Sequence, residues 1–319
     1  MSRIHEALKR AEQERAASQG GRPDASPVMD LPSAEPMPPM PDMARPSAGA
    51  TAAAPAPAPA PSNSQGMPSF TNPFTFDTLL ARCVQSDWQP DAKTMLFFGS
   101  EENGLGTEQF RTLRSRLYQM REKMSLKKIL VTSALPQEGK SFVSANLAQV
   151  LVRQHGRRVL LIDGDLRVAR LHTALGTTSS PGLADYLLGE SDEFSIMQRG
   201  PMDNLFFIPC GRTVAHPAEL IANGRLKMLM QRVEPLFDWI IVDSPPAVPV
   251  SDASQLANFS DGVLMVVRSN ATPYDTAQKA RQEFQGKTLV GVVLNGITRS
   301  DSYSRYYYEV YEKSAKQNA

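Results

Sequence analysis

The chain has 319 residues, and its 34 Lys and Arg against 33 Asp and Glu leave a formal net charge of +1, so the overall charge favours neither nucleic acid nor an anionic membrane as a partner. Two Cys without a CxxC motif and four scattered His exclude a disulfide framework, a cysteine-rich zinc site and an iron–sulfur cluster held by this chain alone. The apolar runs are far shorter than the roughly 20 residues that cross a bilayer, and no apolar signal core opens the chain, so we expect a soluble cytoplasmic protein that reaches a membrane only through a partner.

The first 75 residues divide into two parts. Residues 1–15 predict a short helix, because Ile4, Leu8 and Ala11 recur at helical spacing among charged residues. This helix is either a docking element for a partner or a frayed end without a role. Residues 16–75 hold 14 of the 25 prolines and few large apolar residues, so we expect a disordered Pro/Ala-rich linker. A ligand for a proline-binding domain is the less favoured alternative.

Residues 76–300 predict one α/β domain. Continuous apolar segments alternate along it with segments of helical pattern. The predicted strands are 128–134, 158–163, 205–209, 239–243, 262–268 and 289–294, and the predicted helices are 140–155, 217–236 and 277–284. Apolar strands separated by helices indicate a mostly parallel sheet with helices on both faces. Ligands of such sheets bind at the carboxyl ends of the strands.

The strongest motif lies between the first of these strands and the first of these helices. Residues 134–141 read ALPQEGKS, a P-loop in which Ala134 replaces the usual first Gly. Gly139 permits a tight backbone, Lys140 brings a cation to the phosphates, and Ser141 offers a hydroxyl ligand to Mg²⁺. A capped strand-to-helix turn with an accidental Gly-Lys-Ser is the alternative. The predicted ATP-binding residues are Gln137, Glu138, Gly139, Lys140, Ser141 and Phe142.

Three carboxylates follow two other predicted strands. Asp163 and Asp165 end the second strand in LLIDGD, and Asp243 ends the fourth in IIVDSPP. A single Asp at a strand end is more often a turn former or a helix cap. Three of them beside a P-loop indicate a site for Mg²⁺ and ATP, in which Ser141, Asp243 and Asp165 surround the ion. The sequence therefore predicts a P-loop NTPase fold.

The three segments together resemble the bacterial tyrosine kinases (BY-kinases) of polysaccharide production, where they form the Walker A, Walker A′ and Walker B motifs. The resemblance covers about residues 76–311. It departs at Ala169, where the family usually has Pro, and at Ala134, which is a common variant. It implies an autokinase that moves the terminal phosphoryl group of ATP to tyrosine. In that family's scheme Lys140, Asp163 and Asp165 are catalytic, and Asp163 orients the tyrosine hydroxyl and accepts its proton.

Two more segments match the same family. The tail, residues 301–319, is expected to be the phosphorylated segment, modified between neighbouring subunits. Its phosphoacceptors are Tyr303, Tyr306, Tyr307, Tyr308 and Tyr311. Three of these, at i, i+4 and i+8, also fit an apolar stripe of a packed helix. The segment EQFRTLR matches the ring-assembly motif, so Glu108, Arg111 and Arg114 are expected to contact another copy, whereas a solvated charged helix face is the alternative.

The resemblance also implies partners. A membrane polysaccharide co-polymerase (a chain-length regulator), supplied as a separate protein, would activate the kinase at the inner membrane face. Copies would form a homo-oligomeric ring, and a phosphotyrosine phosphatase would reverse the modification. The competing hypothesis is a non-kinase ATPase switch of the partitioning or septum-positioning type, but residues 133–139 lack the signature lysine of that group. A scaffold with a decayed nucleotide site is disfavoured because the phosphate and Mg²⁺ ligands are present. Arg268 and Asn295 are weak candidates for contacting adenine.

Overall fold

The computed structural model describes residues 74–98 and 104–297, all within the compact unit Met67–Ala319. The expected helix 1–15, nearly all of the linker 16–75 and the tail 301–319 lie outside the described residues, so these expectations stay predictions. Within the described part, no helix is long and apolar enough to cross a membrane.

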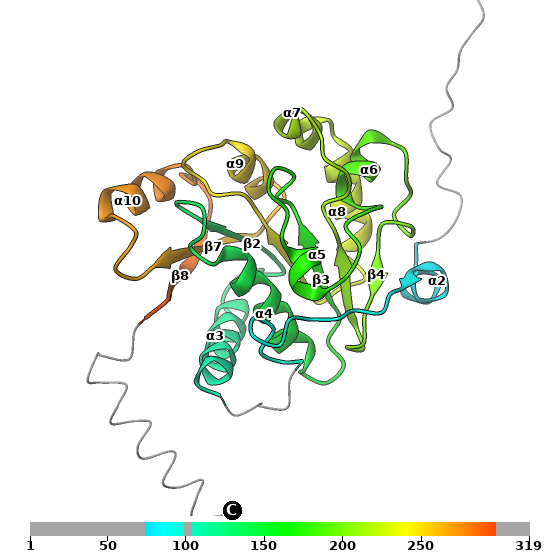
Figure 1. Ribbon diagram of the computed structural model, residues 1–319, viewed down its shortest axis with the longest axis horizontal. Coiled ribbons are helices and arrows are strands. Elements are labelled where there is room, and N and C mark those ends of the chain that lie inside the picture. Colours follow the sequence, from blue (N-terminus) through cyan, green and yellow to red (C-terminus); the bar gives the residue numbers. More distant parts are fainter. Residues whose placement is uncertain (1–73, 99–103, 298–319) are drawn as a thin grey trace, which may run out of the picture. The chain divides into compact units, whose positions relative to one another are not determined.

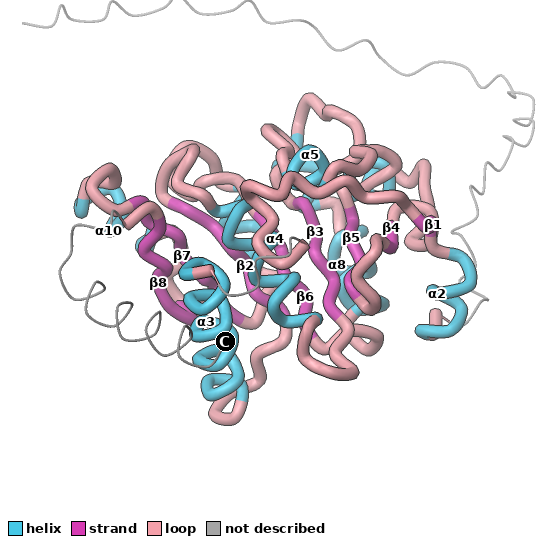
Figure 2. The backbone as a smooth tube through the Cα atoms, turned by 60° about the horizontal axis from the view of Figure 1, so that its bottom comes forward, coloured by secondary structure: helices cyan, strands magenta, loops and turns pink. Residues whose placement is uncertain are grey.

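Eight strands form one sheet. Figures 1 and 2 show this sheet running through the middle of the domain. Every neighbouring pair is parallel except β4 and β5, which are antiparallel. In spatial order the strands are β1 Val84–Gln85, β4 Gln198–Arg199, β5 Leu205–Ile208, β3 Val159–Asp163, β6 Trp239–Asp243, β2 Lys128–Ser133, β7 Gly262–Arg268 and β8 Leu289–Asn295. The mostly parallel sheet predicted from the apolar strands is confirmed.

Helices cover both faces of this sheet (Figure 1). They are α2 Phe76–Arg82, α3 Leu105–Arg121, α4 Lys140–Val152, α5 Leu171–Leu175, α6 Leu183–Leu188, α7 Pro217–Ala222, α8 Arg225–Val233, α9 Asp252–Ala257 and α10 Tyr274–Gln282. Successive side chains of a strand point to opposite faces. In β2, Ile129 and Val131 pack in the core that includes α3 and α4, whereas Leu130 packs in the core that includes α6 to α9. The central strands are therefore apolar at almost every position.

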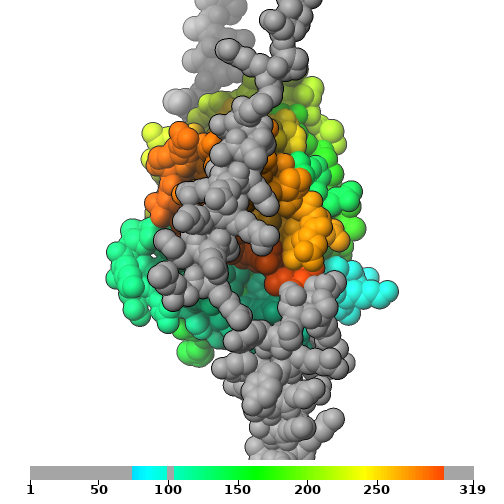
Figure 3. Space-filling view, turned by 90° about the vertical axis from the view of Figure 1, so that its left-hand side faces the viewer, coloured from blue at the N-terminus to red at the C-terminus, as the bar shows by residue number. Residues whose placement is uncertain are grey.

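One edge of the sheet is formed by β8. Figure 3 views the molecule from this side, with α10 and β8 in orange and red. Toward the end of the strand, more exposed and less exposed side chains alternate, and Val292 and Leu294 are about half exposed. The alternation is typical of an edge strand that has one face in the core.

The predicted helix 217–236 is wrong as a single element. Residues Asn223 and Gly224 divide it into α7 and α8, and Gly224 has a φ of +84° that a continuing helix does not allow. The helix predicted over 277–284 begins earlier, after Pro273, whose fixed φ suits the position before a first helical turn. Both differences follow from backbone conformations that apolar periodicity does not report.

A glycine at the end of α5 is tightly packed. Gly176 has a φ of +64°, and a Cβ added there would lie 1.9 Å from the carbonyl oxygen of Gln89. We expect Gly176→Ala to lower the free energy of unfolding by about 3 kcal/mol, since the left-handed conformation and the overlap both oppose the methyl group. Denaturant unfolding measures this. Gly156→Ala is the matched control, because Gly156 has a φ of +72° but open space around it, and it should cost only about 1 kcal/mol. Equal losses would contradict the steric argument.

Candidate active site

The P-loop connects β2 to α4 and is held by hydrogen bonds within and around it. Gly139 has a φ of +96° and Gln137 a φ of +64°, which let the backbone fold tightly before α4 begins at Lys140. Inside the loop, the buried Glu138 accepts the backbone N–H of Leu135 through Oε2 at 2.7 Å, and Oε1 accepts the hydroxyl of Thr272. The glutamate side chain therefore shapes the loop, and only its backbone remains available to a phosphate.

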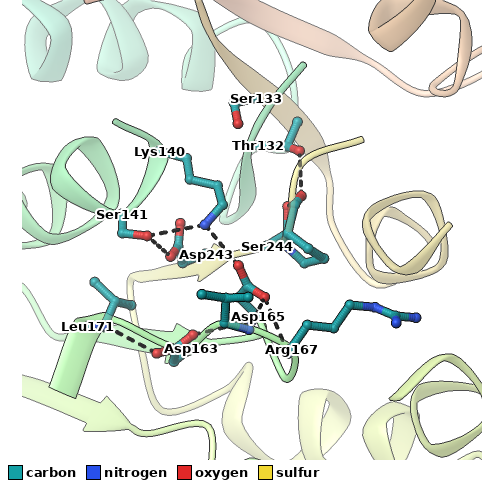
Figure 4. Close-up of polar contacts among 12 residues, drawn as sticks. Thr132, Ser133, Lys140, Ser141, Asp163, Asp165, Arg167, Leu171, Asp243 and Ser244 are labelled. Carbon is teal, nitrogen blue, oxygen red and sulfur yellow. Dashed lines mark hydrogen bonds and ion pairs between the residues drawn. The ribbon is translucent and has the colours of Figure 1, made fainter. Parts of the chain in front are cut away.

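The P-loop side chains meet the carboxylates of β3 and β6 (Figure 4). Lys140 Nζ lies 2.9 Å from Asp165 Oδ2 in an ion pair that is almost fully buried. Ser141 Oγ donates to Asp243 Oδ2 at 2.6 Å. Ser144, on the next turn of α4, donates to Asp243 Oδ1 at 2.9 Å. The strands β3 and β6 are neighbours in the sheet, which brings the acids at their ends to one place.

Asp163 lies deepest in this cluster. It is opposite Asp243 in the strand register and has no exposed surface. Its carboxylate accepts the backbone N–H of Asp165 at 3.2 Å and that of Leu171 at 3.3 Å. These two bonds fix the carboxyl group at the base of the cluster, below Lys140 in Figure 4.

Burial and like charge shift the ionisation of the two strand-end acids. Burial first, then the negative charges of Asp243 and Asp165, raise the pKa of Asp163 well above its usual value. Burial also raises the pKa of Asp243, although Lys140 and two serine hydroxyls oppose the shift. For Lys140 burial works against the charged form, but the attraction of Asp243 and Asp165 outweighs it and raises its pKa. The site therefore concentrates negative charge around one ammonium group.

A cavity of about 550 Å³ opens above these side chains. Its lining comes from the P-loop and α4 (Pro136, Gln137, Gly139, Lys140, Ser141, Phe142), from the segment after β3 (Asp165, Arg167, Val168, Arg170) and from the segment after β6 (Pro245, Pro246, Pro249, Val250). The size suits a nucleotide. Ser141 and Asp243 offer oxygen ligands of the kind that Mg²⁺ prefers. The residues present therefore fit ATP with Mg²⁺, and every residue predicted to bind ATP lies in this lining except Glu138.

Sequence reasoning missed the two arginines of this lining. Arg167 makes a two-pronged ion pair with the buried Asp252, with Nε–Oδ2 at 2.7 Å and Nη2–Oδ1 at 3.0 Å. Arg170 lies three residues further along and is exposed. The sequence could have indicated both arginines, because they follow Asp165 in the loop after β3. Side chains in that loop border the carboxyl edge of the sheet.

Comparisons with known proteins agree with this geometry. A family model described as an AAA domain matches residues 127–280. Tyrosine-protein kinase YwqD of Bacillus subtilis is 35% identical over 211 residues, which are 65% of this chain and 89% of that protein. This chain belongs to the bacterial tyrosine-protein kinases. Tyrosine-protein kinase wzc of Salmonella typhimurium is 33% identical over 211 residues, but the match spans only 29% of that longer relative.

Solved structures share this fold, and they include the kinase domain of a bacterial tyrosine kinase. The chimerical protein CapA2B2 superposes with a TM-score of 0.62 at 26% identity, covering 70% of this chain and 98% of that one. The kinase domain of the Escherichia coli tyrosine kinase ETK superposes with a TM-score of 0.58 at 29% identity, covering 60% of this chain and 76% of that one. The P-loop fold and the kinase family expected from the motifs are both confirmed.

The residues predicted for ring assembly lie on α3 of this kinase. Glu108 and Arg111 form an ion pair with each other, one helical turn apart. Arg114 points back to the domain and donates through Nη1 to the carbonyl of Val150, near the end of α4, at 3.0 Å. Glu108 and Arg111 are thus on the outer side of α3, whereas Arg114 also ties α3 to α4. The tail tyrosines lie outside the described residues.

The two candidates for contacting adenine both hydrogen-bond to the P-loop, and their contact with adenine stays a prediction. Arg268 Nη1 donates to the carbonyl of Gln137 at 3.0 Å, and Asn295 Nδ2 donates to the carbonyl of Glu138 at 2.9 Å. Neither belongs to the cavity lining. They come from the ends of β7 and β8, so these strands brace the loop from the side away from β6.

This bracing predicts a kinetic effect in the kinase. Asn295→Ala should raise KM for ATP about 5-fold with little change in kcat, because the loop loses one hydrogen bond of about 1 kcal/mol that orders it before the nucleotide binds. Steady-state phosphorylation at varied ATP concentration measures both constants. Asn295→Asp keeps the shape but replaces the amide donor with a carboxylate that faces the carbonyl of Glu138, so it should raise KM at least as much as the alanine variant. A normal KM in both variants would show that the P-loop keeps its conformation without the hydrogen bond from Asn295.

Proposed function

We propose that this tyrosine kinase uses ATP and Mg²⁺ to phosphorylate the C-terminal tyrosine cluster of a neighbouring copy, and that this cycle regulates exopolysaccharide biosynthesis and chain length. The proposal rests on one observation above all. Lys140, Ser141 and Asp165 line a single nucleotide-sized cavity, where Ser141 contacts Asp243, and Asp243 lies opposite Asp163 in the sheet. A non-kinase ATPase switch would need the same phosphate-binding residues, but the relatives reported above are named tyrosine kinases.

The proposed reaction assigns a task to each side chain. The P-loop amides and Lys140 hold the phosphates of ATP, which requires Lys140 to leave Asp165. Mg²⁺ held by Ser141 and Asp243 would neutralise charge on those phosphates as the bond to the leaving ADP lengthens. The phenol oxygen of the incoming tyrosine forms the new bond to phosphorus while Asp163 orients the hydroxyl and takes its proton. The raised pKa of Asp163 favours that proton transfer.

Partners and place follow from the same proposal. A membrane polysaccharide co-polymerase would recruit and activate the kinase at the inner membrane face, with residues 1–15 helping to dock. Glu108, Arg111 and Arg114 would join copies into a ring. Each tail phosphate adds about −1.5 to −2 charge, so phosphorylation would loosen the ring by repulsion, and a phosphotyrosine phosphatase would reset it.

Mass spectrometry after incubation with ATP and Mg²⁺ tests the proposal. We expect phosphate within the tail cluster, Tyr303 to Tyr311, and none on Tyr274, which is 78% exposed in the domain and so controls for accessibility alone. A chain whose five tail tyrosines are Phe serves as the active kinase, and an Asp163→Asn chain with an intact tail serves as acceptor. The acceptor should be phosphorylated in the mixture and not alone. ATP hydrolysis without protein phosphorylation would instead establish the ATPase switch.

A further inference from the structure

A second group of ligand-type side chains includes Asp163 and two residues outside the nucleotide cavity. One carboxylate oxygen of Asp163, one ring nitrogen of His172 and the sulfur of Cys210 all lie within 4.8 Å of one another. The proposed kinase reaction uses only the first of the three. Spacing along the sequence gave no hint of this group, since its members are separated by 8 and 37 other positions.

The topology of the sheet explains why these residues meet. The strands β3 and β5 are parallel neighbours, with Ile162 paired to Ile208, so the segments that follow them leave the same edge of the sheet. Asp163 ends β3, and Cys210 stands two residues after β5. The backbone there is held in place, because the carbonyl of Cys210 accepts the N–H of Ala184 at 2.8 Å.

One tautomer of His172 leaves a buried ring nitrogen free to bind a metal ion. Its Nε2 lies 3.2 Å from the hydroxyl of Thr173, and its buried Nδ1 has no hydrogen-bond partner among the described residues. When Nε2 carries the proton and donates to Thr173, the lone pair of Nδ1 is free, which is how a second contact usually orients a metal-binding histidine. Burial lowers the pKa of His172, so the neutral ring predominates at neutral pH.

Negative charge surrounds the buried thiol of Cys210. The thiol is buried and donates to the carbonyl of Gly211 at 3.1 Å. Burial, together with the negative charges of Asp163, Asp165 and Asp185, raises the pKa of the Cys210 thiol to about 12. These carboxylates repel a negatively charged thiolate. The same carboxylates attract a divalent cation, which would in turn stabilise the thiolate. One Asp carboxylate and one thiolate would balance the charge of such an ion.

We propose that Asp163, His172 and Cys210 form a binding site for Zn²⁺, with a fourth coordination position open to water. One sulfur, one nitrogen and one oxygen ligand suit Zn²⁺ and do not suit Mg²⁺, which takes oxygen ligands. Zinc–ligand bonds of about 2.0–2.3 Å place the ligand atoms about 3.5 Å apart in a tetrahedron, so the three atoms must approach by at most about 1.3 Å. On binding, the Cys210 proton passes to solvent and the sulfur–zinc bond takes its place.

The site has a consequence that rests on the proposed function. Zn²⁺ on Asp163 occupies the carboxylate that would otherwise orient the tyrosine hydroxyl and accept its proton. Zinc and tyrosine phosphorylation therefore exclude each other, and the ion inhibits the kinase without displacing the nucleotide ligands Lys140, Ser141 and Asp243.

Cobalt and zinc titrations of the reduced full chain, without nucleotide or Mg²⁺, test the site itself. We expect one equivalent of Co²⁺ to give the near-ultraviolet thiolate band and the visible bands of a tetrahedral centre. Cys210→Ser should lose the thiolate band, and both Cys210→Ser and His172→Gln should weaken Zn²⁺ affinity by at least about 10-fold, measured by competition with a chromophoric chelator. Cys83→Ser and His155→Gln are the matched controls and should leave spectrum and affinity unchanged.

Three results would overturn the inference. The first is a folded wild-type chain without a cobalt–thiolate band, and the second is a band that survives in Cys210→Ser or disappears in Cys83→Ser. X-ray absorption on the zinc-loaded wild-type chain, which needs no variant to fold, gives the third if it finds no sulfur neighbour. Chelator-reversible inhibition of tail phosphorylation that is absent in Cys210→Ser would support the proposed consequence. If Zn²⁺ binds as described but phosphorylation continues, the metal site stands and the role given to Asp163 is wrong.

Discussion

Asp163→Asn should lower the rate of tyrosine phosphorylation by about 10²- to 10⁴-fold while making the protein more stable. The loss of activity follows from removing the group that takes the phenolic proton. The gain in stability follows from removing a charge that the fold buries beside two other carboxylates. The Asn side chain keeps one oxygen to accept the backbone N–H groups of Asp165 or Leu171. We expect the free energy of unfolding to rise by about 1–2 kcal/mol at pH 7.

The pH dependence of this gain has a definite sign. The pKa of Asp163 is raised in the folded state, so the folded chain holds this proton more tightly than the unfolded chain. Below the ordinary pKa of about 3.9 both states are protonated and the carboxyl costs nothing. The cost grows as the pH rises past that value and is constant above the folded pKa. The stability advantage of Asp163→Asn should therefore shrink as the pH falls toward 4.

Urea unfolding of the free protein at pH 7 and at pH 4.5 measures both statements. Asp252→Asn provides a matched control, because Asp252 is equally buried but paired with Arg167. That substitution breaks a pair and should lower the free energy of unfolding. A less stable Asp163→Asn chain at pH 7 would mean that Lys140 already compensates the charge of Asp163.

The main strands could be predicted because both of their faces are buried. Runs such as residues 239–243 are apolar at nearly every position, and the structure places β6 there with every residue buried. The two-residue strands β1 and β4 lack such a run, so the sequence does not predict them. Their pairing depends on the neighbouring strands and not on their own composition. The break between α7 and α8 rests on one left-handed glycine within an otherwise continuous apolar pattern.

The chemistry-bearing residues of the site could be predicted, but most of their partners could not. A P-loop motif and a carboxylate at a strand end are local patterns. The pairing of Lys140 with Asp165, and the bracing of the loop by Asn295, depend on which strands are neighbours in space. The same holds for Cys210 beside Asp163, because only the order of strands in the sheet shows that β5 lies next to β3.

Lys140→Met should abolish measurable tail phosphorylation and also destabilise the domain. The activity falls by at least about 10²-fold, because the variant has no cation to hold the charge that develops on the transferred phosphoryl group. Its ion pair with Asp165 is almost fully buried, and removing one partner of a buried pair costs about 3–5 kcal/mol. Phosphotyrosine formation and denaturant unfolding should therefore both change.

A second substitution separates these two effects of Lys140. Lys140→Met with Asp165→Asn removes both charges, so it should recover most of the lost stability and none of the activity. Lys128→Met is the matched control, because Lys128 pairs with Glu234 at 2.7 Å and Asp261 at 3.3 Å on β2, away from the cavity. It should lower stability by a smaller amount, about 1 kcal/mol, and leave phosphorylation intact. If the double variant regained activity, the role of Lys140 would be to neutralise Asp165 and not to hold phosphate.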